Sequence, residues 1–122
     1  MKIEWSFTGD KAIYSQIVEQ VKLLIASGRL KSGQRLDSVR DIASAAKVNP
    51  NTVQRAFAEL ERMGLVYTER TNGRFITCDE ELIGKMKKEL AAEQVSSFLK
   101  RMKALGYSKE MIADLINSKE EE

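Results

Sequence analysis

Apolar residues recur at helical spacing in five segments of the chain, and two short runs between them have β-strand character. The first helix is expected from Ala12 to Ser27, where apolar positions three and four apart form one stripe. Gly28 should end it, because glycine readily adopts the left-handed conformation of a helix C-terminus. The next segment, 29–36, contains Gly33 and shows no period, so it is predicted to be a loop.

Two helices joined by a tight turn are predicted next. The first, Ser38–Ala46, begins with a capping-box pattern in which Asp41 replaces the usual glutamate. Lys47 and Val48 form the turn. The second begins at Pro50, is capped by Asn49 and ends at Gly64. Their buried faces are expected to be Val39, Ile42, Ala43 and Ala46 in the first helix, and Val53, Ala56, Phe57 and Leu60 in the second, with Met63 as a further candidate.

A β-hairpin should follow, with strands at Leu65–Arg70 and Arg74–Cys78 joined by Thr71, Asn72 and Gly73. An Asn-Gly pair favours a hairpin turn because both residues accept a positive φ. Cys78, at the end of an apolar run, is expected to be a small core residue. A helix-turn-helix followed by a hairpin is the winged variety, so the fold class is mainly α with a small hairpin.

The C-terminal part is predicted to contain two helices, one from Asp79 to Leu105 and one that begins after Ser108. We expect a DNA-binding domain at 1–78 and a dimerisation domain at 79–122. The long helix carries a row of apolar residues along one side, and the last helix could cover that whole row. The last helix spans only about three turns, however, so some of this apolar surface should remain for a second copy. The candidate dimerisation residues are Ile83, Met86, Leu90, Ala91, Val95, Phe98, Leu99, Met102, Leu105, Met111, Ile112, Leu115 and Ile116.

Composition narrows the function classes. The chain has no histidine, one cysteine, and no nucleophile or phosphate-binding motif, so no enzyme, metal or cofactor is expected. Residues 1–78 carry 12 Lys and Arg against 8 Asp and Glu, whereas residues 79–122 carry 8 against 10. A basic N-terminal part suits a polyanionic partner. Neither a signal peptide nor a membrane span is visible, so a cytoplasmic protein without a membrane partner is expected.

The start of the third helix has the side chains needed to read DNA. Asn and Gln pair with adenine, Arg pairs with guanine, and a Thr methyl can touch a thymine methyl. The small basic hairpin tip suits a minor groove or a phosphate ridge. Alternatively these are ordinary solvated residues, Arg40 pairs with Asp41 or Glu59, and the hairpin tip is a plain tight turn. The rival function is a winged helix that binds another protein. The candidate DNA-binding residues are Ser38, Arg40, Asn49, Asn51, Thr52, Gln54, Arg55, Arg70, Asn72, Gly73 and Arg74.

Several strings within residues 11–78 also resemble the DNA-binding domain of the GntR family of transcription regulators. They are Ile13–Ile17, Gly28–Leu30, Leu36–Arg40, Asn49–Phe57, Leu60–Glu61 and Gly64–Val66. The 44 residues after Cys78 resemble the short helical tail of the YtrA subfamily, which serves dimerisation and whose members often control operons of ABC-type transporters.

This resemblance implies a homodimeric regulator, usually a repressor, that binds duplex operator DNA. Two recognition helices in a dimer require an inverted repeat with half-sites about one helical turn apart, or a multiple of that. Family positions that contact DNA correspond to Arg40, Asn49, Asn51, Thr52 and Gln54, and Gly73 corresponds to the wing tip. The sequence departs from the family pattern at Ala12 and Asp37, where proline is usual, and at Thr71, where the wing usually has glycine. No residue identifies a small-molecule effector.

Overall fold

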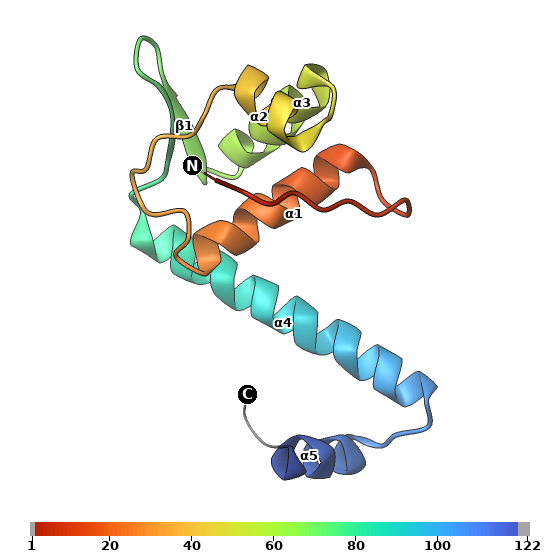
Figure 1. Cartoon of the computed structure of the whole chain (residues 1–122). Helices are drawn as coiled ribbons and strands as arrows, with labels where there is room; N and C mark the ends of the chain where they lie inside the picture. The colour runs from red at the N-terminus through yellow and green to blue at the C-terminus, as the bar shows by residue number, and fades with distance from the viewer. Residues whose placement is uncertain (1, 120–122) are drawn as a thin grey trace. The chain divides into compact units, whose positions relative to one another are not determined.

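The computed structural model describes residues 2–119, in which five helices and one two-stranded antiparallel hairpin follow one another along the chain (Figure 1). This confirms the predicted fold class. The chain forms two compact units, one up to Lys87 and one from Lys88 onward, so α4 begins in the first and continues into the second. The elements are α1 (Ile13–Ala26), α2 (Val39–Ala46), α3 (Pro50–Arg62), β1 (Val66–Glu69), β2 (Gly73–Ile76), α4 (Glu80–Ala104) and α5 (Lys109–Ser118).

The core of the N-terminal unit forms where the apolar stripes of α1, α2 and α3 meet the start of β1 and the end of β2. Its largest fully buried side chains are Phe57, Ile17, Ile42, Leu60, Leu65, Ile76, Val21 and Val53. The predicted faces of α2 and α3 are confirmed, except that Val39 and Ala46, at the two ends of α2, and Met63, just after α3, are only half-buried. Both predicted caps are also present, since Ser38 Oγ accepts from the Asp41 amide at 3.1 Å and Asn49 Oδ1 from the Asn51 amide at 2.8 Å.

The turn between α2 and α3 depends on a left-handed lysine. Lys47 has φ 58° and ψ 47°, a conformation that costs an L-residue about 1–2 kcal/mol. It lets the Val48 amide bond back to the Ala43 carbonyl at 3.0 Å, which ends α2 and directs the chain to Asn49. The turn therefore fixes the angle at which α3 leaves α2.

The hairpin has the predicted strands in a register that runs from Val66 opposite Ile76 to Glu69 opposite Gly73. The predicted hairpin is present, but of the Asn-Gly pair only Gly73 has a positive φ, of 103°. The Asn72 amide bonds the Glu69 carbonyl at 3.3 Å, which gives a β-turn followed by a left-handed glycine. A longer loop between the paired ends removes the need for two positive φ angles.

The segment predicted as a loop between α1 and α2 instead pairs with the free edge of β2. The Gly33 amide bonds the Ile76 carbonyl at 2.9 Å, and the Leu36 amide bonds the Arg74 carbonyl at 2.8 Å. Arg35 and Phe75 form an isolated antiparallel bridge between these bonds. The segment thus adds a short third strand-like edge that fixes the hairpin to the helices.

Cys78 lies beyond the end of β2 and is exposed, so its predicted place in the core was wrong. The last buried residues of this run are Ile76 and Thr77, and the chain then turns toward α4. Cys78 lies near Tyr67, whose pKa is raised by partial burial and, to a smaller extent, by the neighbouring Cys78 and Glu69. The cysteine packs at the surface and contributes little to the interior.

An N-terminal arm runs alongside α1 and was not predicted from the sequence (Figure 1). Its side chains alternate between half-buried and exposed from Ile3 to Phe7, and the Trp5 and Phe7 rings stack with their centroids 6.4 Å apart. Gln16 and Gln20 on α1 bond the arm's backbone at Thr8 and Ser6. The arm is thus held by polar as well as apolar contacts.

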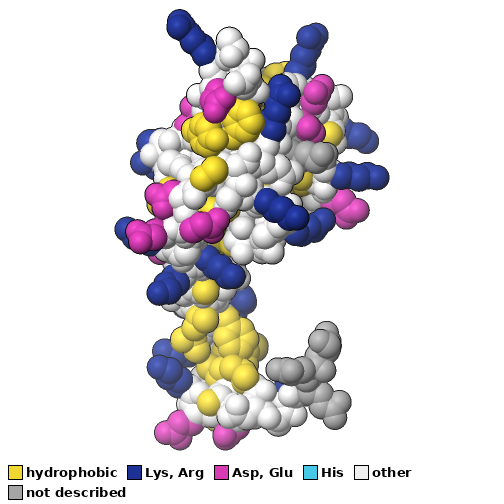
Figure 2. Space-filling view, turned by 90° about the vertical axis from the view of Figure 1, so that its left-hand side faces the viewer, with side chains coloured by type: hydrophobic (Ala, Val, Ile, Leu, Met, Phe, Trp, Pro, Cys, Tyr) yellow, Lys and Arg dark blue, Asp and Glu magenta, His cyan; other side chains and the backbone are white. Residues whose placement is uncertain are grey.

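The C-terminal unit consists of the rest of α4, a turn at Gly106 with φ 92°, and α5. Ser108 Oγ accepts from the Met111 amide at 3.2 Å, which confirms the predicted cap of α5. Among the described residues of this unit, Ile112 is the apolar residue that is fully covered, at 2% exposure. Figure 2 shows hydrophobic side chains gathered on this part of the chain, toward the lower end of the view.

Candidate nucleic-acid interface

The start of α3 presents a polar edge to solvent. Val53, Ala56, Phe57 and Leu60 bury one side of the helix, so residues on the opposite side project outward. Asn51 and Gln54 are both exposed there. Ala58, one turn after Gln54, is also exposed, and its small side chain does not project beyond them. Carboxamide groups on such an edge each offer one acceptor and two donor hydrogens, which is what the edge of a base pair requires.

One flank of α3 faces the hairpin. Glu61, seven residues after Gln54 on the same side, accepts from Arg74 Nε at 2.9 Å and from Thr68 Oγ1 at 2.6 Å. The Arg74 guanidinium also lies over the Phe57 ring, 5.5 Å from its centroid. Arg74, a predicted DNA-binding residue, is therefore half-buried and ion-paired inside the unit, where it joins the hairpin to α3.

The tip of the hairpin lies beyond these contacts. Arg70, Thr71 and Asn72 are exposed, and Gly73 is half-buried beside Arg35. Asn72 Nδ2 donates to a Glu69 carboxylate oxygen at 2.8 Å, so part of the tip's hydrogen-bonding capacity is used locally. Arg70 is the cation of the predicted tip that remains free of any ion pair within residues 2–119.

The other flank of α3 faces the start of α1. The Arg55 guanidinium lies over the Tyr14 ring, 3.8 Å from its centroid. A hollow of about 400 Å³ opens beside this pair, lined by Ile13, Tyr14, Asn51, Thr52 and Arg55. Thr52 is half-buried there, whereas Arg55 is exposed. Predicted DNA-binding residues from α3 are thus brought together with Tyr14, whose role the sequence did not indicate.

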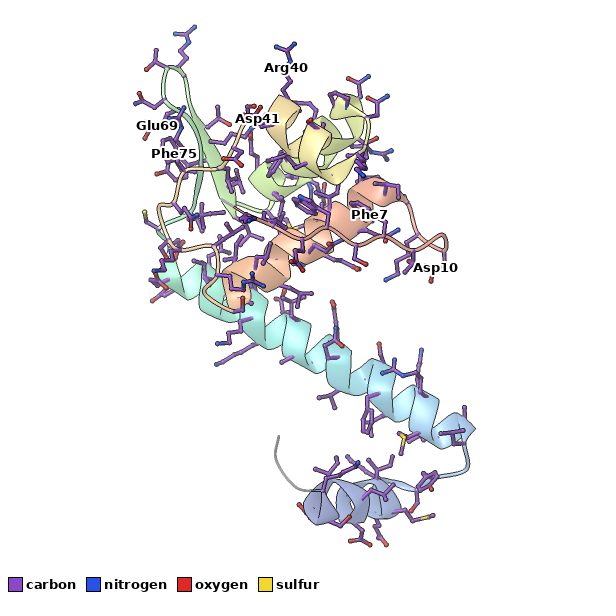
Figure 3. The ribbon with its side chains drawn as sticks, viewed as in Figure 1. Phe7, Asp10, Arg40, Asp41, Glu69 and Phe75 are labelled. Carbon is purple, nitrogen blue, oxygen red and sulfur yellow. The ribbon has the colours of Figure 1, made fainter. Side chains whose placement is uncertain are left out.

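Arg40, in the first turn of α2, points away from the helix pair (Figure 3). It forms no ion pair with any residue in the part of the chain that the structure describes, so the alternative of a pair with Asp41 or Glu59 is not observed. Glu59 instead bonds Arg62, which lowers the pKa of the Glu59 carboxyl. Arg40 therefore keeps its charge and donors available, while the hydroxyl oxygen of its neighbour Ser38 is engaged in the cap.

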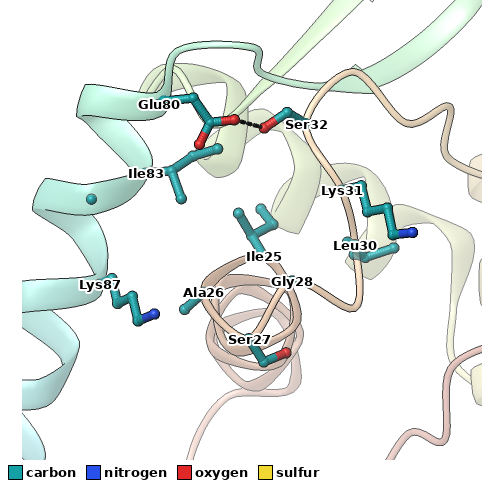
Figure 4. A pocket seen from close by; sticks show the side chains of 11 residues that line it. Ile25, Ala26, Ser27, Gly28, Leu30, Lys31, Ser32, Glu80, Ile83 and Lys87 are labelled. Atoms are coloured by element: carbon teal, nitrogen blue, oxygen red, sulfur yellow. Dashed lines mark hydrogen bonds between the residues drawn. The ribbon is translucent and has the colours of Figure 1, made fainter.

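The first turns of α4 pack onto the N-terminal unit through apolar contacts. Met86 is 5% exposed, and Ile83 lines a groove of about 670 Å³ opposite Ile25 (Figure 4). At one end of this groove Ser32 donates a hydrogen bond to Glu80. Met86 was predicted to contact a second copy, but its surface is already covered within this unit. The prediction was wrong because it assigned the apolar residues along the whole of α4 to contact with a second copy, whereas the first turns of α4 pack within the N-terminal unit.

In the C-terminal unit, most of the predicted dimerisation residues remain at least partly open. Ile112 is covered within the unit, contrary to its predicted contact with a second copy, and Phe98, Leu99 and Met102 are half-buried. The exposed apolar residues, which we call the open apolar face, are Val95, Leu105, Met111, Leu115 and Ile116, with exposures from 42% to 72%.

Residues 2–119 contain neither a candidate metal site nor a candidate membrane-spanning helix. No group of three or more Cys, Asp or Glu side chains in this part of the chain is placed to hold a metal ion. None of its helices combines the length and the hydropathy needed to cross a membrane.

The sequence is similar to those of known proteins. Residues 13–76 match the profile of the bacterial regulatory proteins of the gntR family. The chain is 40% identical over 112 residues to the uncharacterized HTH-type transcriptional regulator YhcF of Bacillus subtilis (strain 168), covering 92% of this chain and 93% of YhcF. It is 46% identical over 65 residues to the HTH-type transcriptional repressor YtrA of the same organism, covering 53% and 50%.

Among solved structures, a GntR family transcriptional regulator from Listeria monocytogenes superposes with a TM-score of 0.85 at 37% identity. The match covers 93% of this chain and all of that one, so the resemblance includes the C-terminal helices. The relatives named above are regulators of transcription.

Proposed function

The chain belongs to the GntR family of bacterial regulatory proteins, and from this premise we propose that it is a repressor that binds an inverted-repeat operator as a homodimer. That it is a transcription regulator with a DNA-binding domain, and not an enzyme, follows from the family. The repression, the dimer and the operator symmetry are the proposal. The observation that carries it is the exposed polar edge at the start of α3.

We assign base contacts to the front of that edge. Asn51 and Gln54 are exposed, and a carboxamide pairs bidentately with adenine in the major groove. Arg40 supports the assignment because it is exposed and free of an ion pair within residues 2–119. Asn49 bonds the Asn51 amide and so orders the first turn of α3. Arg70 and Asn72 are assigned to the backbone or minor groove at the hairpin tip.

The homodimer is proposed through the open apolar face of the C-terminal unit. Large apolar side chains exposed together on a small unit mark an interaction surface. A second copy of the chain is the occupant that also explains a palindromic operator, because a two-fold axis pairs two recognition helices about 34 Å apart, one helical turn of DNA. Repression then needs only that the bound dimer overlap a promoter, and YtrA, a partial relative, is named a repressor.

Fluorescence anisotropy on labelled duplexes tests the DNA-binding part. The labelled DNA is the region upstream of the protein's own gene, and a scrambled duplex of equal length is the reference. We expect binding that weakens steeply with salt, and Gln54→Ala should lose about 1–3 kcal/mol on the upstream duplex only. Asn117→Ala is the matched control, because Asn117 is an exposed carboxamide on α5. Absence of salt-sensitive duplex binding would favour a protein–protein interaction module instead.

Sedimentation equilibrium tests the dimer. Val95→Glu places a charge on the open apolar face, where Val95 is 55% exposed, and should shift the protein toward monomer. Ser97→Glu adds the same charge at an exposed position on another side of α4 and should leave the dimer intact. A wild-type chain that sediments as a monomer at micromolar concentration contradicts this part of the proposal.

A further inference from the structure

The contact between Arg55 and Tyr14 joins the second residue of α1 to the sixth residue of α3. The Arg55 side chain is exposed, whereas Tyr14 is half-buried between the two helices. Their separation of 3.8 Å from guanidinium carbon to ring centroid is that of direct stacking. Because α1 and α3 pack against each other through the core, the position of the ring is fixed by the fold.

Stacking occupies only the face of the guanidinium group. Its five N–H donors lie in the plane of the group and point outward at its edge, so they remain free when the face is covered. No carboxylate in residues 2–119 forms an ion pair with Arg55. The ring therefore holds the group in place, while its N–H donors have no carboxylate partner among residues 2–119.

We propose that Tyr14 is a positioning residue that holds Arg55 ready to bind a DNA phosphate beside the recognition helix. The inference rests on the proposed function and assigns Arg55 a phosphate rather than a base. Arg55 leans over α1 on one flank of α3, whereas Gln54 lies on the side of α3 that faces the hairpin. A free arginine side chain loses considerable rotamer freedom when it binds, and prior stacking removes part of that cost before DNA arrives.

A double-mutant cycle measured by anisotropy tests the inference, on the upstream and the scrambled duplex. Arg55→Ala should weaken binding to both duplexes by the same factor and reduce the slope of log affinity against log salt by about 0.9, as the loss of one phosphate contact requires. Tyr14→Leu should weaken both about two- to fivefold, because the Arg55 side chain then loses its rotamer freedom only on binding. In the Arg55→Ala background, Tyr14→Leu should cause no further loss.

Two further variants keep the test decisive. Tyr14→Phe restores the ring and should recover most of the affinity lost in Tyr14→Leu. Arg55→Lys keeps the charge at an exposed position but not the flat group, so it should weaken binding about two- to fivefold. This loss can be measured even if Tyr14→Leu fails to fold. Leu23→Ala, at an exposed site on α1, is the control for nonspecific effects of changing that helix.

Three results would overturn the inference. The Tyr14→Leu loss could persist in full when Arg55 is absent, Tyr14→Leu could strengthen binding because the stack competes with DNA, or the Arg55→Ala loss could be confined to the upstream duplex. In each case wild-type protein still binds DNA specifically, and the proposed function stands. Failure of the wild-type protein to bind any duplex would instead remove the proposed function.

Discussion

Replacing Gln16 with alanine should detach the N-terminal arm and cost a measurable part of the stability. Gln16 is 6% exposed, its Oε1 accepts from the Thr8 amide at 2.8 Å, and its Nε2 donates to the Thr8 and Lys11 carbonyls at 2.9 and 2.8 Å. Gln20 makes the equivalent pair of bonds to Ser6 at 3.1 and 2.8 Å. The two amides thus bond the arm as a neighbouring strand would.

The spacing explains why this arrangement works. Residues four apart on a helix are separated by about 6.0 Å along its axis, and residues two apart in an extended chain by about 6.6 Å. Gln16 and Gln20 therefore meet Thr8 and Ser6 in step. A hydrogen bond contributes about 0.5–1.5 kcal/mol net, so three bonds set an upper range of about 1.5–4.5 kcal/mol. Because the released backbone is rehydrated, we expect about 1.5–3 kcal/mol for Gln16→Ala. Gln20 is only half-buried and its two bonds are open to solvent, so Gln20→Ala should cost about 1 kcal/mol or less.

Urea unfolding read by two signals provides the assay. Trp5 is the single tryptophan of the chain and lies in the arm, so its fluorescence reports on the arm, while far-ultraviolet circular dichroism reports on the helices. At equal protein concentration, the two transitions should coincide in the wild type, and in Gln16→Ala the fluorescence change should come first. The reasoning is refuted if Gln16→Ala keeps its stability within about 0.5 kcal/mol, or if Gln20→Ala costs as much.

Three further stability changes follow from single contacts, each measured by thermal or urea unfolding. Lys47→Gly should stabilise by about 0.5–1 kcal/mol, because glycine relieves the left-handed strain at φ 58° but is more flexible when unfolded; a decrease would contradict this. Glu61→Gln should destabilise by about 0.5–1.5 kcal/mol, since it leaves the half-buried Arg74 without its counter-charge, and an unchanged midpoint would show that the pair is neutral. Gly73→Ala should destabilise by about 1–2 kcal/mol, because φ is 103° and the new Cβ would lie 3.2 Å from Arg35 Nε; wild-type stability would exclude this crowding.

Much of the fold could be predicted because its signals are local. The caps at Ser38, Asn49 and Ser108 each depend on one side chain and a backbone amide two or three residues later. The helical stripes likewise reflect a repeat within each segment. These features require no knowledge of distant contacts, and the structure has each of them where the sequence indicates.

The remaining features depend on partners far along the chain. The strand-like segment around Arg35 is stabilised by backbone bonds to β2, which leave no pattern in its own side chains. The arm is recognised by two glutamines on α1 that resemble ordinary polar positions in the sequence. Met86 was assigned to a second copy because the pattern shows that a stripe is apolar and not what covers it.

The candidate site likewise combines features that could be predicted from local sequence with features that depend on distant contacts. Outward positions on α3 follow from the helical repeat, so the exposure of Asn51 and Gln54 could be predicted. Which neighbours restrain the flanking arginines could not, because that depends on how α1 and the hairpin pack against α3. Arg55 stacks on Tyr14 on one flank, and Arg74 pairs with Glu61 on the other.

In vitro selection of DNA sequences, carried out in parallel with wild-type protein and with Gln54→Ala, tests most directly whether the exposed edge of α3 reads bases. We predict that the wild type selects an inverted repeat and that Gln54→Ala selects the same repeat with the preference lost at one base pair in each half-site. Identical preferences for the two proteins, or no enriched sequence with the wild type, would contradict the account.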